Sequence, residues 1–340
     1  MPSAYDLEFE DLAGLLEDEP AYRSRQVFDA LHKGLKTPEE MTELPKALRS
    51  RLSEELPSAL EIATRSITDD GQTVKWAFRL HDGSIIETVL MLYPDRGTVC
   101  VSSQAGYAMG CTFCATGQGG FSRHLSVGEI VEQVVVASRE ALPRRVTNVV
   151  FMGMGEPLAN YDRLIAAIRR MNGPLGLGAR RLTVSTVGVV PGIKRLTEDP
   201  LAVNLAVSLH AATDVKRDAL VPLNRRYPLG VLADACADYV ETTHRRLSFE
   251  WALIDGVNDT DSDIAELAAY ARPLRAHVNV IPLNPTPGYL VRGSSMARVH
   301  EFATSLEDLG VTTTIRATRG REIDAACGQL AQRAQVELRR

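Results

Sequence analysis

The sequence predicts an α/β protein, a partial (β/α) TIM-like barrel that follows a small N-terminal helical accessory module and a β-hairpin extension. Three observations lead to this fold class. From residue 98 onward, short apolar strands alternate with amphipathic helices, a pattern typical of parallel strands joined by right-handed crossovers. Residues 61–92 alternate between apolar and polar side chains, and residues 1–56 have helical periodicity. We therefore divide the chain into regions 1–56, 57–97 and 98–340.

The first two regions carry local signals for their elements. In RSRQVFDALHKGL, Val27, Phe28 and Leu31 lie on one helical face and basic residues on the other. TVKWAFRL and SIIETVLML read as strands, and the tripeptides DDG and HDG are hairpin turn signals. We expect short helices followed by an antiparallel extension.

The third region contains six or more strand–helix units, more than a four-stranded sheet needs. The predicted strands are TVCVSS, VTNVVFMG, RLTVSTV, AVNLAVSLH, LSFEWALI, HVNVIPL and TTTIRAT. The predicted helices are SVGEIVEQVVVASREAL, YDRLIAAIRRM, DSDIAELAAYA, ARVHEFATSLEDLG and one at the C-terminus. Ser126 and Glu129 form a capping box at the first helix. In a barrel of this kind the catalytic loops follow the carboxyl ends of the strands.

Composition favours a cytoplasmic protein that is not embedded in a membrane. The chain has 340 residues, is 45% hydrophobic and 24% charged, and has a net charge of −5. No apolar run approaches the roughly 18–20 residues of a membrane span, and the acidic N-terminus does not resemble a secretory signal. Five cysteines fit a reducing compartment. Residues 21–51 carry seven basic and four acidic residues, so a local basic face toward phosphate is compatible with the overall charge.

The stretch CVSSQAGYAMGCTFCATGQGGF, residues 100–121, contains the pair Cys111 and Cys114. A Cys-x-x-Cys pair alone is compatible with half a zinc site, a redox pair or two unrelated thiols. A zinc ribbon needs a second pair, whereas Cys100, Cys236 and Cys327 stand singly. A redox motif of the thioredoxin type begins a helix, whereas a glycine-rich loop follows here. Four residues before Cys111, where a third cysteine would complete an iron–sulfur motif, stands Tyr107.

With this loop the sequence resembles the RlmN/Cfr family of radical-SAM RNA methyltransferases, and its RlmN members in particular. The resemblance covers nearly the whole chain. Its motifs are CVSSQAG, CTFCATGQGGF, VFMGMGEPLAN, LTVSTVGVVPGI, VSLHA, IPLNP and TRGREIDAACGQLA. It implies a barrel of the radical-SAM type, with S-adenosylmethionine and a [4Fe–4S] cluster as cofactors.

The resemblance also implies roles for individual residues. Cys111 and Cys114 match two cluster ligands, and Tyr107 occupies the position of the third. Residues that match the S-adenosylmethionine site are Gly155, Glu156, Ser185, Ser208, Leu209, His210 and Asn284. Cys327 matches a cysteine that is itself methylated, Cys100 the cysteine that resolves the protein–RNA crosslink, and Glu87 a proton acceptor.

The implied reaction needs two separate thiols because C2 of adenine is not nucleophilic. One S-adenosylmethionine methylates the Cys327 thiolate. A second is cleaved to a 5′-deoxyadenosyl radical, which takes hydrogen from that methyl group, and the carbon radical adds to adenine C2. Loss of the C2 proton and attack of Cys100 on the Cys327 sulfur release the RNA and leave a disulfide bond. The substrates implied are 23S rRNA and tRNA, with an external one-electron donor such as a flavodoxin-type protein. We expect the N-terminal module, residues 1–56, to help bind this RNA through its basic stretch 21–51.

Several residues also have a purely structural interpretation. Cys236 fits a small core residue, His210 fits a satisfied polar side chain, and Glu87 fits an acid that faces solvent. For Tyr107 three interpretations stay open: a phenolate ligand, a bystander next to a cluster with two cysteine ligands, or a lost cluster. The last leads to an alternative function, a degenerate family member that binds S-adenosylmethionine or RNA without radical methyl transfer. The presence of both Cys100 and Cys327 favours retained chemistry.

Overall fold

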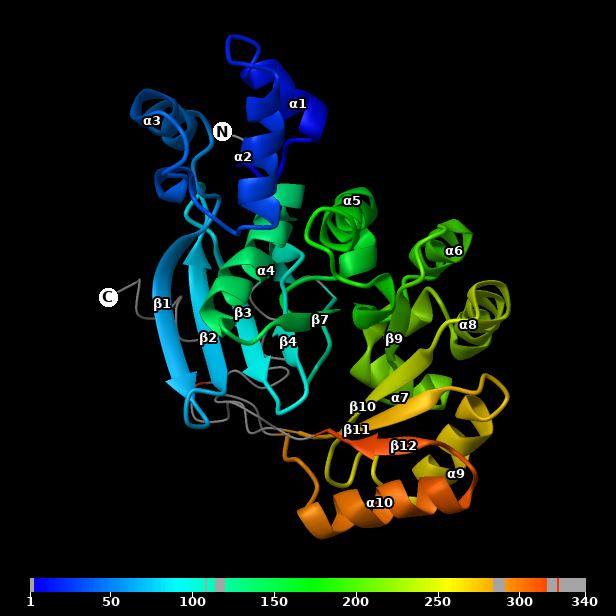
Figure 1. Ribbon diagram of the computed structural model, residues 1–340. Coiled ribbons are helices and arrows are strands. Elements are labelled where there is room, and N and C mark those ends of the chain that lie inside the picture. The colour runs from blue at the N-terminus through cyan, green and yellow to red at the C-terminus, as the bar shows by residue number, and fades with distance from the viewer. Residues whose placement is uncertain (1–2, 108, 114–119, 284–290, 317–322, 324–340) are drawn as a thin grey trace.

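One ten-stranded sheet organises the structure, a computed structural model that describes residues 3–107, 109–113, 120–283, 291–316 and 323 (Figure 1). The strands follow the order β1-β2-β3-β4-β7-β8-β9-β10-β11-β12. Their bounds are β1 Glu61–Thr68, β2 Thr73–Arg79, β3 Ile85–Leu92, β4 Gly97–Cys100, β7 Val146–Phe151, β8 Leu182–Thr186, β9 Asn204–Ser208, β10 Leu247–Leu253, β11 His277–Pro282 and β12 Thr313–Ile315.

The part of the sheet from β4 to β12 is entirely parallel and forms the predicted partial barrel. Among the described strands β12 pairs with β11 alone, so the barrel stays open. Its helices lie on the outer side of the curved sheet (Figure 1). They are α4 Val127–Ala141, α5 Tyr161–Asn172, α6 Val190–Glu198, α7 Asp214–Leu220, α8 Leu229–Thr243, α9 Asp261–Ala271 and α10 Met296–Asp308, with short 3-10 turns η3 Pro157–Asn160, η4 Ala179–Arg181 and η5 Pro222–Arg225.

The predicted β extension is continuous with the barrel. Strands β1, β2 and β3 form an antiparallel meander, and β3 pairs with β4 in a register that sets Val89 opposite Cys100. Both turn signals are confirmed: Asp69, Asp70 and Gly71 have positive φ between β1 and β2, and Gly83 does so between β2 and β3. The extension therefore holds the first barrel strand in place.

The N-terminal module consists of α1 Phe9–Leu15, α2 Tyr22–His32, the 3-10 turn η1 Pro38–Glu40 and α3 Lys46–Glu55. Val27, Phe28 and Leu31 of α2 are buried, as their spacing predicts. The module is tied to the barrel at the start of the chain, where Asp6 accepts from the Gly128 amide at 2.7 Å and Arg170 donates to the Tyr5 carbonyl at 3.2 Å.

Other local predictions are also confirmed. Ser126 Oγ accepts from the Glu129 amide at 3.1 Å, and the Glu129 carboxylate accepts from the Ser126 amide at 2.9 Å. Cys236 is fully buried in α8 and serves as a core residue. In the described part of the chain no helix has the length and apolar character that a membrane crossing requires. The predicted C-terminal helix lies outside the described residues.

Candidate active site

The cysteine loop connects the two strands of a separate small hairpin, β5 Gln104–Tyr107 and β6 Gly120–His124. The sequence analysis did not predict this hairpin. Tyr107 pairs with Gly120, and Gly106 has a φ of +78°. A Cβ atom at Gly106 would come within 2.0 Å of the Gly120 carbonyl oxygen, so only glycine fits there. The hairpin thus fixes the two ends of the loop at close range.

Tyr107 and Cys111 are buried together at the carboxyl ends of the barrel strands. They belong to an apolar cluster with Val187, Ala211 and Ile254, which follow β8, β9 and β10. Phe113 extends this contact, with its ring 4.6 Å from the ring of His210. The described part of the cysteine loop therefore lies beside the segments that follow β8, β9 and β10.

The metal donors in this loop do not fit a site of three thiolates. Cys111 is the one cysteine of the pair among the described residues, and Cys114 lies outside them. Position 107 offers a phenol of pKa about 10, a harder ligand than a thiol of pKa about 8.5. Within the described ranges, no group of three or more His, Cys, Asp or Glu side chains could hold a metal ion.

The loop after β7 is held tightly by hydrogen bonds around Glu156. Its carboxylate accepts from the amides of Val187 at 2.9 Å and Leu158 at 3.1 Å, and its own amide donates to Gln104 Oε1 at 2.8 Å. Burial raises the pKa of Glu156 to about 7, against the lowering effect of these hydrogen bonds. Gly155 has a φ of +102°, and a Cβ there would meet Gln104 within 2.5 Å.

His210 is a buried connector at the end of β9. Its Nδ1 accepts from the Ala252 amide at 3.0 Å, and its carbonyl accepts from Asn258 Nδ2 at 2.8 Å. Burial, with a smaller contribution from nearby Arg217, lowers the pKa of His210 to about 3, so the imidazole is neutral. The side chain is a satisfied polar residue in the described structure.

Arg217 of α7, which the sequence analysis missed, joins the ends of two strands. Its guanidinium donates to the carbonyls of Val187 at 2.7 Å, Leu209 at 3.1 Å and Ser208 at 3.3 Å, and to Asn224 Oδ1 at 2.9 Å. Its side chain is buried, and burial lowers its pKa. We call Glu156, His210, Arg217 and Asn258 the strand-end frame, because each of them links neighbouring strand ends through buried hydrogen bonds.

Ser185, Ser208 and Leu209 lie at the same strand ends as the strand-end frame. Ser185 Oγ donates to the Phe151 carbonyl at 2.5 Å, which joins β8 to β7. The Leu209 amide donates to the Glu250 carbonyl at 3.1 Å, which joins β9 to β10. The structure therefore brings the predicted segments 155–156, 185 and 208–210 to adjacent strand ends, whereas Asn284 and Cys327 lie outside the described residues.

Glu87 and Cys100 lie on one face of the sheet. Val89 stands opposite both Lys75 and Cys100, and Glu87 is two residues from Val89 on β3, so all four side chains share a face. Thr88 points to the other face and donates to Gln133 of α4 at 2.8 Å, so Glu87 and Cys100 face away from α4. The suggestion that Glu87 faces solvent is wrong: it is 1% exposed, with Lys75 Nζ at 3.3 Å.

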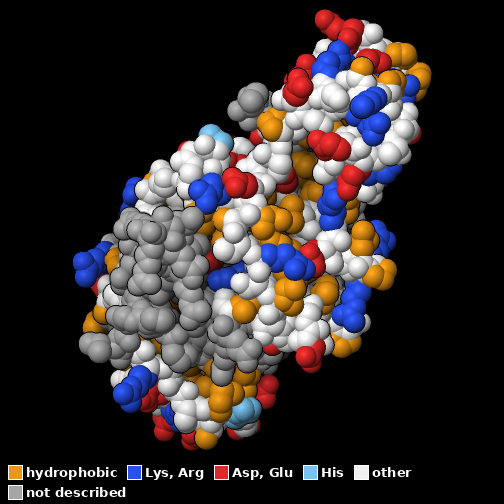
Figure 2. All heavy atoms as spheres, turned by 90° about the vertical axis from the view of Figure 1, so that its left-hand side faces the viewer, with side chains coloured by type: hydrophobic (Ala, Val, Ile, Leu, Met, Phe, Trp, Pro, Cys, Tyr) orange, Lys and Arg blue, Asp and Glu red, His pale blue; other side chains and the backbone are white. Residues whose placement is uncertain are grey.

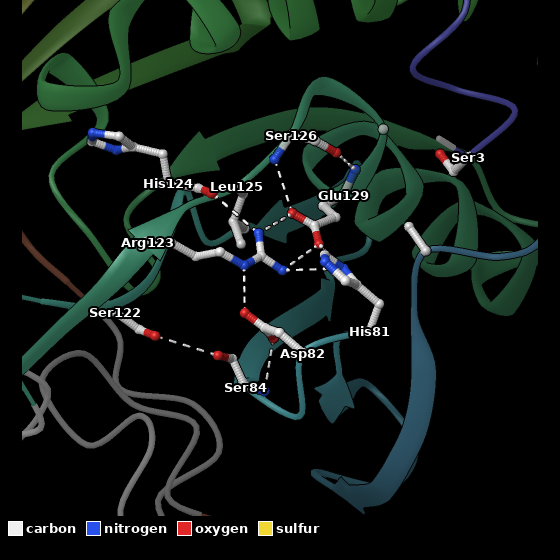
Figure 3. A network of polar contacts seen from close by, with 12 residues as sticks. Ser3, His81, Asp82, Ser84, Ser122, Arg123, His124, Leu125, Ser126 and Glu129 are labelled. Carbon is white, nitrogen blue, oxygen red and sulfur yellow. Dashed lines mark hydrogen bonds and ion pairs between the residues drawn. The ribbon is translucent and has the colours of Figure 1, made fainter. Parts of the chain in front are cut away.

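Arg123 of β6 links the hairpin to two other elements through hydrogen bonds and ion pairs, away from the strand-end frame (Figure 3). Its guanidinium donates to both oxygens of Glu129 at 2.7 and 2.8 Å and to Asp82 at 2.6 Å. Burial alone would raise the pKa of Asp82, but the hydrogen bonds from Arg123 and Ser84 lower it to about 2. One side chain thus ties β6 to the start of α4 and to the turn between β2 and β3.

Comparison with known proteins agrees with this geometry. Residues 104–271 match the radical SAM superfamily. The chain is 51% identical to a probable dual-specificity RNA methyltransferase RlmN of Chloroflexus aurantiacus, over 98% of this chain and 94% of that protein. It is 53% identical to a protein of the same name from Frankia casuarinae, over 92% and 78%. A radical SAM methyltransferase from Sphaerobacter thermophilus superposes with a TM-score of 0.94 at 49% identity, over 98% and 100% of the two chains.

Proposed function

We propose, from the premise that this chain belongs to the RlmN family of radical SAM RNA methyltransferases, that it methylates C2 of adenosine in RNA. The observation that carries the proposal is identity of about half the residues over nearly the whole chain, on the same fold. The RNA proposed is 23S rRNA, tRNA or both, with a flavodoxin-type protein as electron donor.

S-adenosylmethionine is the proposed methyl source. Gly155, Glu156, Ser185, Ser208, Leu209 and His210, with Asn284, are proposed to bind it. The convergence of the first six on adjacent strand ends supports this assignment. Both oxygens of Glu156 already accept backbone amides, so this carboxylate holds the loop in place whether or not it also accepts from a ligand ammonium.

The proposed chemical groups are Cys327 as methyl carrier, Cys100 as the thiol that resolves the crosslink, and Glu87 as proton acceptor. Support for the last two is their shared, buried face of the sheet. The donors at positions 107, 111 and 114 do not match a site of three thiolates, so these assignments rest on the positions of the residues themselves.

A second candidate is a family member that binds S-adenosylmethionine or RNA without radical methyl transfer. The observation that favours it is the burial of Tyr107 in an apolar cluster at the place of the missing thiol.

The test is anaerobic incubation of the whole protein with S-adenosylmethionine, a reductant and either a tRNA transcript or a 23S rRNA fragment. Mass spectrometry of the digested RNA should detect 2-methyladenosine. Cys327→Ala should abolish the product, and Cys100→Ala should leave protein covalently attached to RNA. Binding of both partners without product, with product gained in Tyr107→Cys, would establish the second candidate instead.

A further inference from the structure

A groove of about 660 Å³ lies at the end of the barrel opposite the site. It is formed where the chain enters β7 and β8, beside the ends of α2, α4 and α5. We call it the entry groove; its lining residues include Lys33, Leu35, Arg144, Arg145, Leu175 and Arg181. Strand β7 has six residues, so the groove and the catalytic loops are about 20 Å apart.

All four charged residues that line the entry groove are basic: Lys33, Arg144, Arg145 and Arg181. His32 also lines it, and burial lowers the pKa of that imidazole, so it stays neutral. The remaining lining is uncharged, with apolar side chains of Leu35, Val134, Leu175 and Leu177. In a chain with a net charge of −5, such a groove is a local positive site with an uncharged floor.

In the basic stretch of the N-terminal module, residues 21–51, three of the seven basic residues form ion pairs, and no ion pair is described for the other four, Arg23, Arg25, Lys46 and Arg49. Lys36 pairs with Glu43 at 3.1 Å, Arg51 with Asp18 at 2.5 Å, and Lys33 with Asp29 at 3.1 Å. Figure 2 shows basic and acidic side chains interspersed over the projecting module. In the part of the chain that the structure describes, no ion pair is formed by Arg144, Arg145 or Arg181, which are exposed. The entry groove therefore combines three arginines that form no described ion pair with a lining that contains no acidic residue.

We propose that the entry groove binds the sugar–phosphate backbone of the RNA substrate, away from the adenosine that reacts. The proposal rests on the proposed function, because it takes RNA as the substrate. Unpaired arginines suit phosphate oxygens, and an uncharged floor accommodates ribose. A small ligand cannot reach both the groove and the catalytic loops, whereas a folded RNA can extend over the side of the barrel. The groove therefore contributes to RNA affinity and leaves the chemical step unchanged.

The test measures binding of a labelled tRNA transcript to the whole protein at several salt concentrations. Arg144→Ala/Arg145→Ala should weaken binding and reduce the slope of log Kd against log salt by about 1–2, because two phosphate contacts are lost. Arg144→Lys/Arg145→Lys should restore most of the slope. The matched control is Arg245→Ala/Arg246→Ala, an arginine pair that also precedes a barrel strand but does not line the groove. S-adenosylmethionine affinity and kcat should not change, whereas KM for RNA should rise.

Binding separates this proposal from the proposed function. A wild-type protein that binds tRNA with a steep salt slope but makes no 2-methyladenosine contradicts the function, while the slopes of the variants still judge the groove. Equal slopes for the wild type, the groove variant and the control overturn the groove proposal. Binding of inorganic pyrophosphate is measured for the wild type and the groove variant as well. If the variant no longer binds pyrophosphate but has unchanged RNA affinity, the groove proposal is also overturned, because the groove is then a small-anion site. A wild type that binds neither the tRNA transcript nor a 23S rRNA fragment overturns both.

Discussion

The strand-end frame and the β5–β6 hairpin meet at one end of the barrel but are held by different forces. In the frame, Glu156, His210 and Arg217 are buried and bonded mostly to backbone groups of neighbouring strands. The hairpin is held by the partly exposed Arg123, by the apolar burial of Tyr107 and by Gln104, whose side chain accepts from the Glu156 amide of the frame. Tyr107 itself lies in the apolar cluster, away from that bond. We therefore expect a change at Tyr107 to leave the hydrogen bonds of the frame intact.

Arg217→Met is the strongest test of the frame. It leaves the carbonyls of Val187 and Leu209 without this donor in a buried site, so we expect a loss of about 3–5 kcal/mol in the free energy of unfolding. Urea denaturation measures the loss, and S-adenosylmethionine affinity should fall with it. Arg225→Met, an exposed arginine nearby in the chain, is the control. A cost below 1 kcal/mol would show that the frame does not depend on Arg217.

His210→Asn tests the same frame through the pH dependence of the free energy of unfolding. The pKa of His210 is about 3 in the folded protein and near 6.5 when unfolded, so the unfolded state binds the extra proton between these values. As pH falls below 6.5, protonation of His210 in the unfolded state therefore lowers the free energy of unfolding. Burial of Glu156, whose pKa is raised to about 7, acts in the opposite direction between pH 4.5 and 7. The wild type should lose about 2 kcal/mol relative to His210→Asn between pH 6.5 and 4.5. Parallel pH profiles of the two proteins would contradict the assignment of a neutral, buried His210.

Tyr107→Cys examines the hairpin. Removal of a buried ring should cost about 2–3 kcal/mol of stability, yet iron and sulfide content after anaerobic reconstitution should rise, because a third thiol joins Cys111 and Cys114. Tyr107→Ser is the matched control, since it leaves a similar cavity without a thiolate. Equal iron loading in the wild type and both variants would mean that position 107 does not limit cluster assembly.

Arg123→Met should have the smallest effect on stability, about 1 kcal/mol, because the Arg123 side chain is partly exposed. Its specific signature is at Asp82, whose pKa should rise from about 2 toward its ordinary value near 4. Carboxyl chemical shifts in a pH titration report this change. An unchanged Asp82 titration would show that Arg123 does not hold the turn between β2 and β3.

Much of the fold is predictable from local pattern, and the exceptions have physical reasons. The parallel strands, the turns at Gly71 and Gly83 and the Ser126 capping box each depend on a few adjacent residues. The β5–β6 hairpin escaped prediction because its short strands include Gly106 and Gly120, which carry little strand signal.

Sequence motifs predict only part of the site. GMGEP and SLH mark their loops, but Arg217 lies in DVKRDAL, a segment that reads as a surface helix. Its side chain is buried because four acceptors meet there from separate parts of the chain. Glu87 was open to a solvent-facing interpretation because an acid in a strand pattern does not reveal whether its face of the sheet is covered, and the structure buries it. In both cases, contacts with residues distant in the sequence decide whether the side chain is buried.

The contact between Gly106 and Gly120 has a consequence for substitutions at position 107. These glycines hold the backbone of the hairpin at both ends of the loop, so a substitution at position 107 should change side-chain packing and leave the strand pairing in place. Codons for tyrosine and cysteine differ by a single base. One mutation can therefore replace a phenol by a thiol at this position, at the cost of the packing that the buried ring provides.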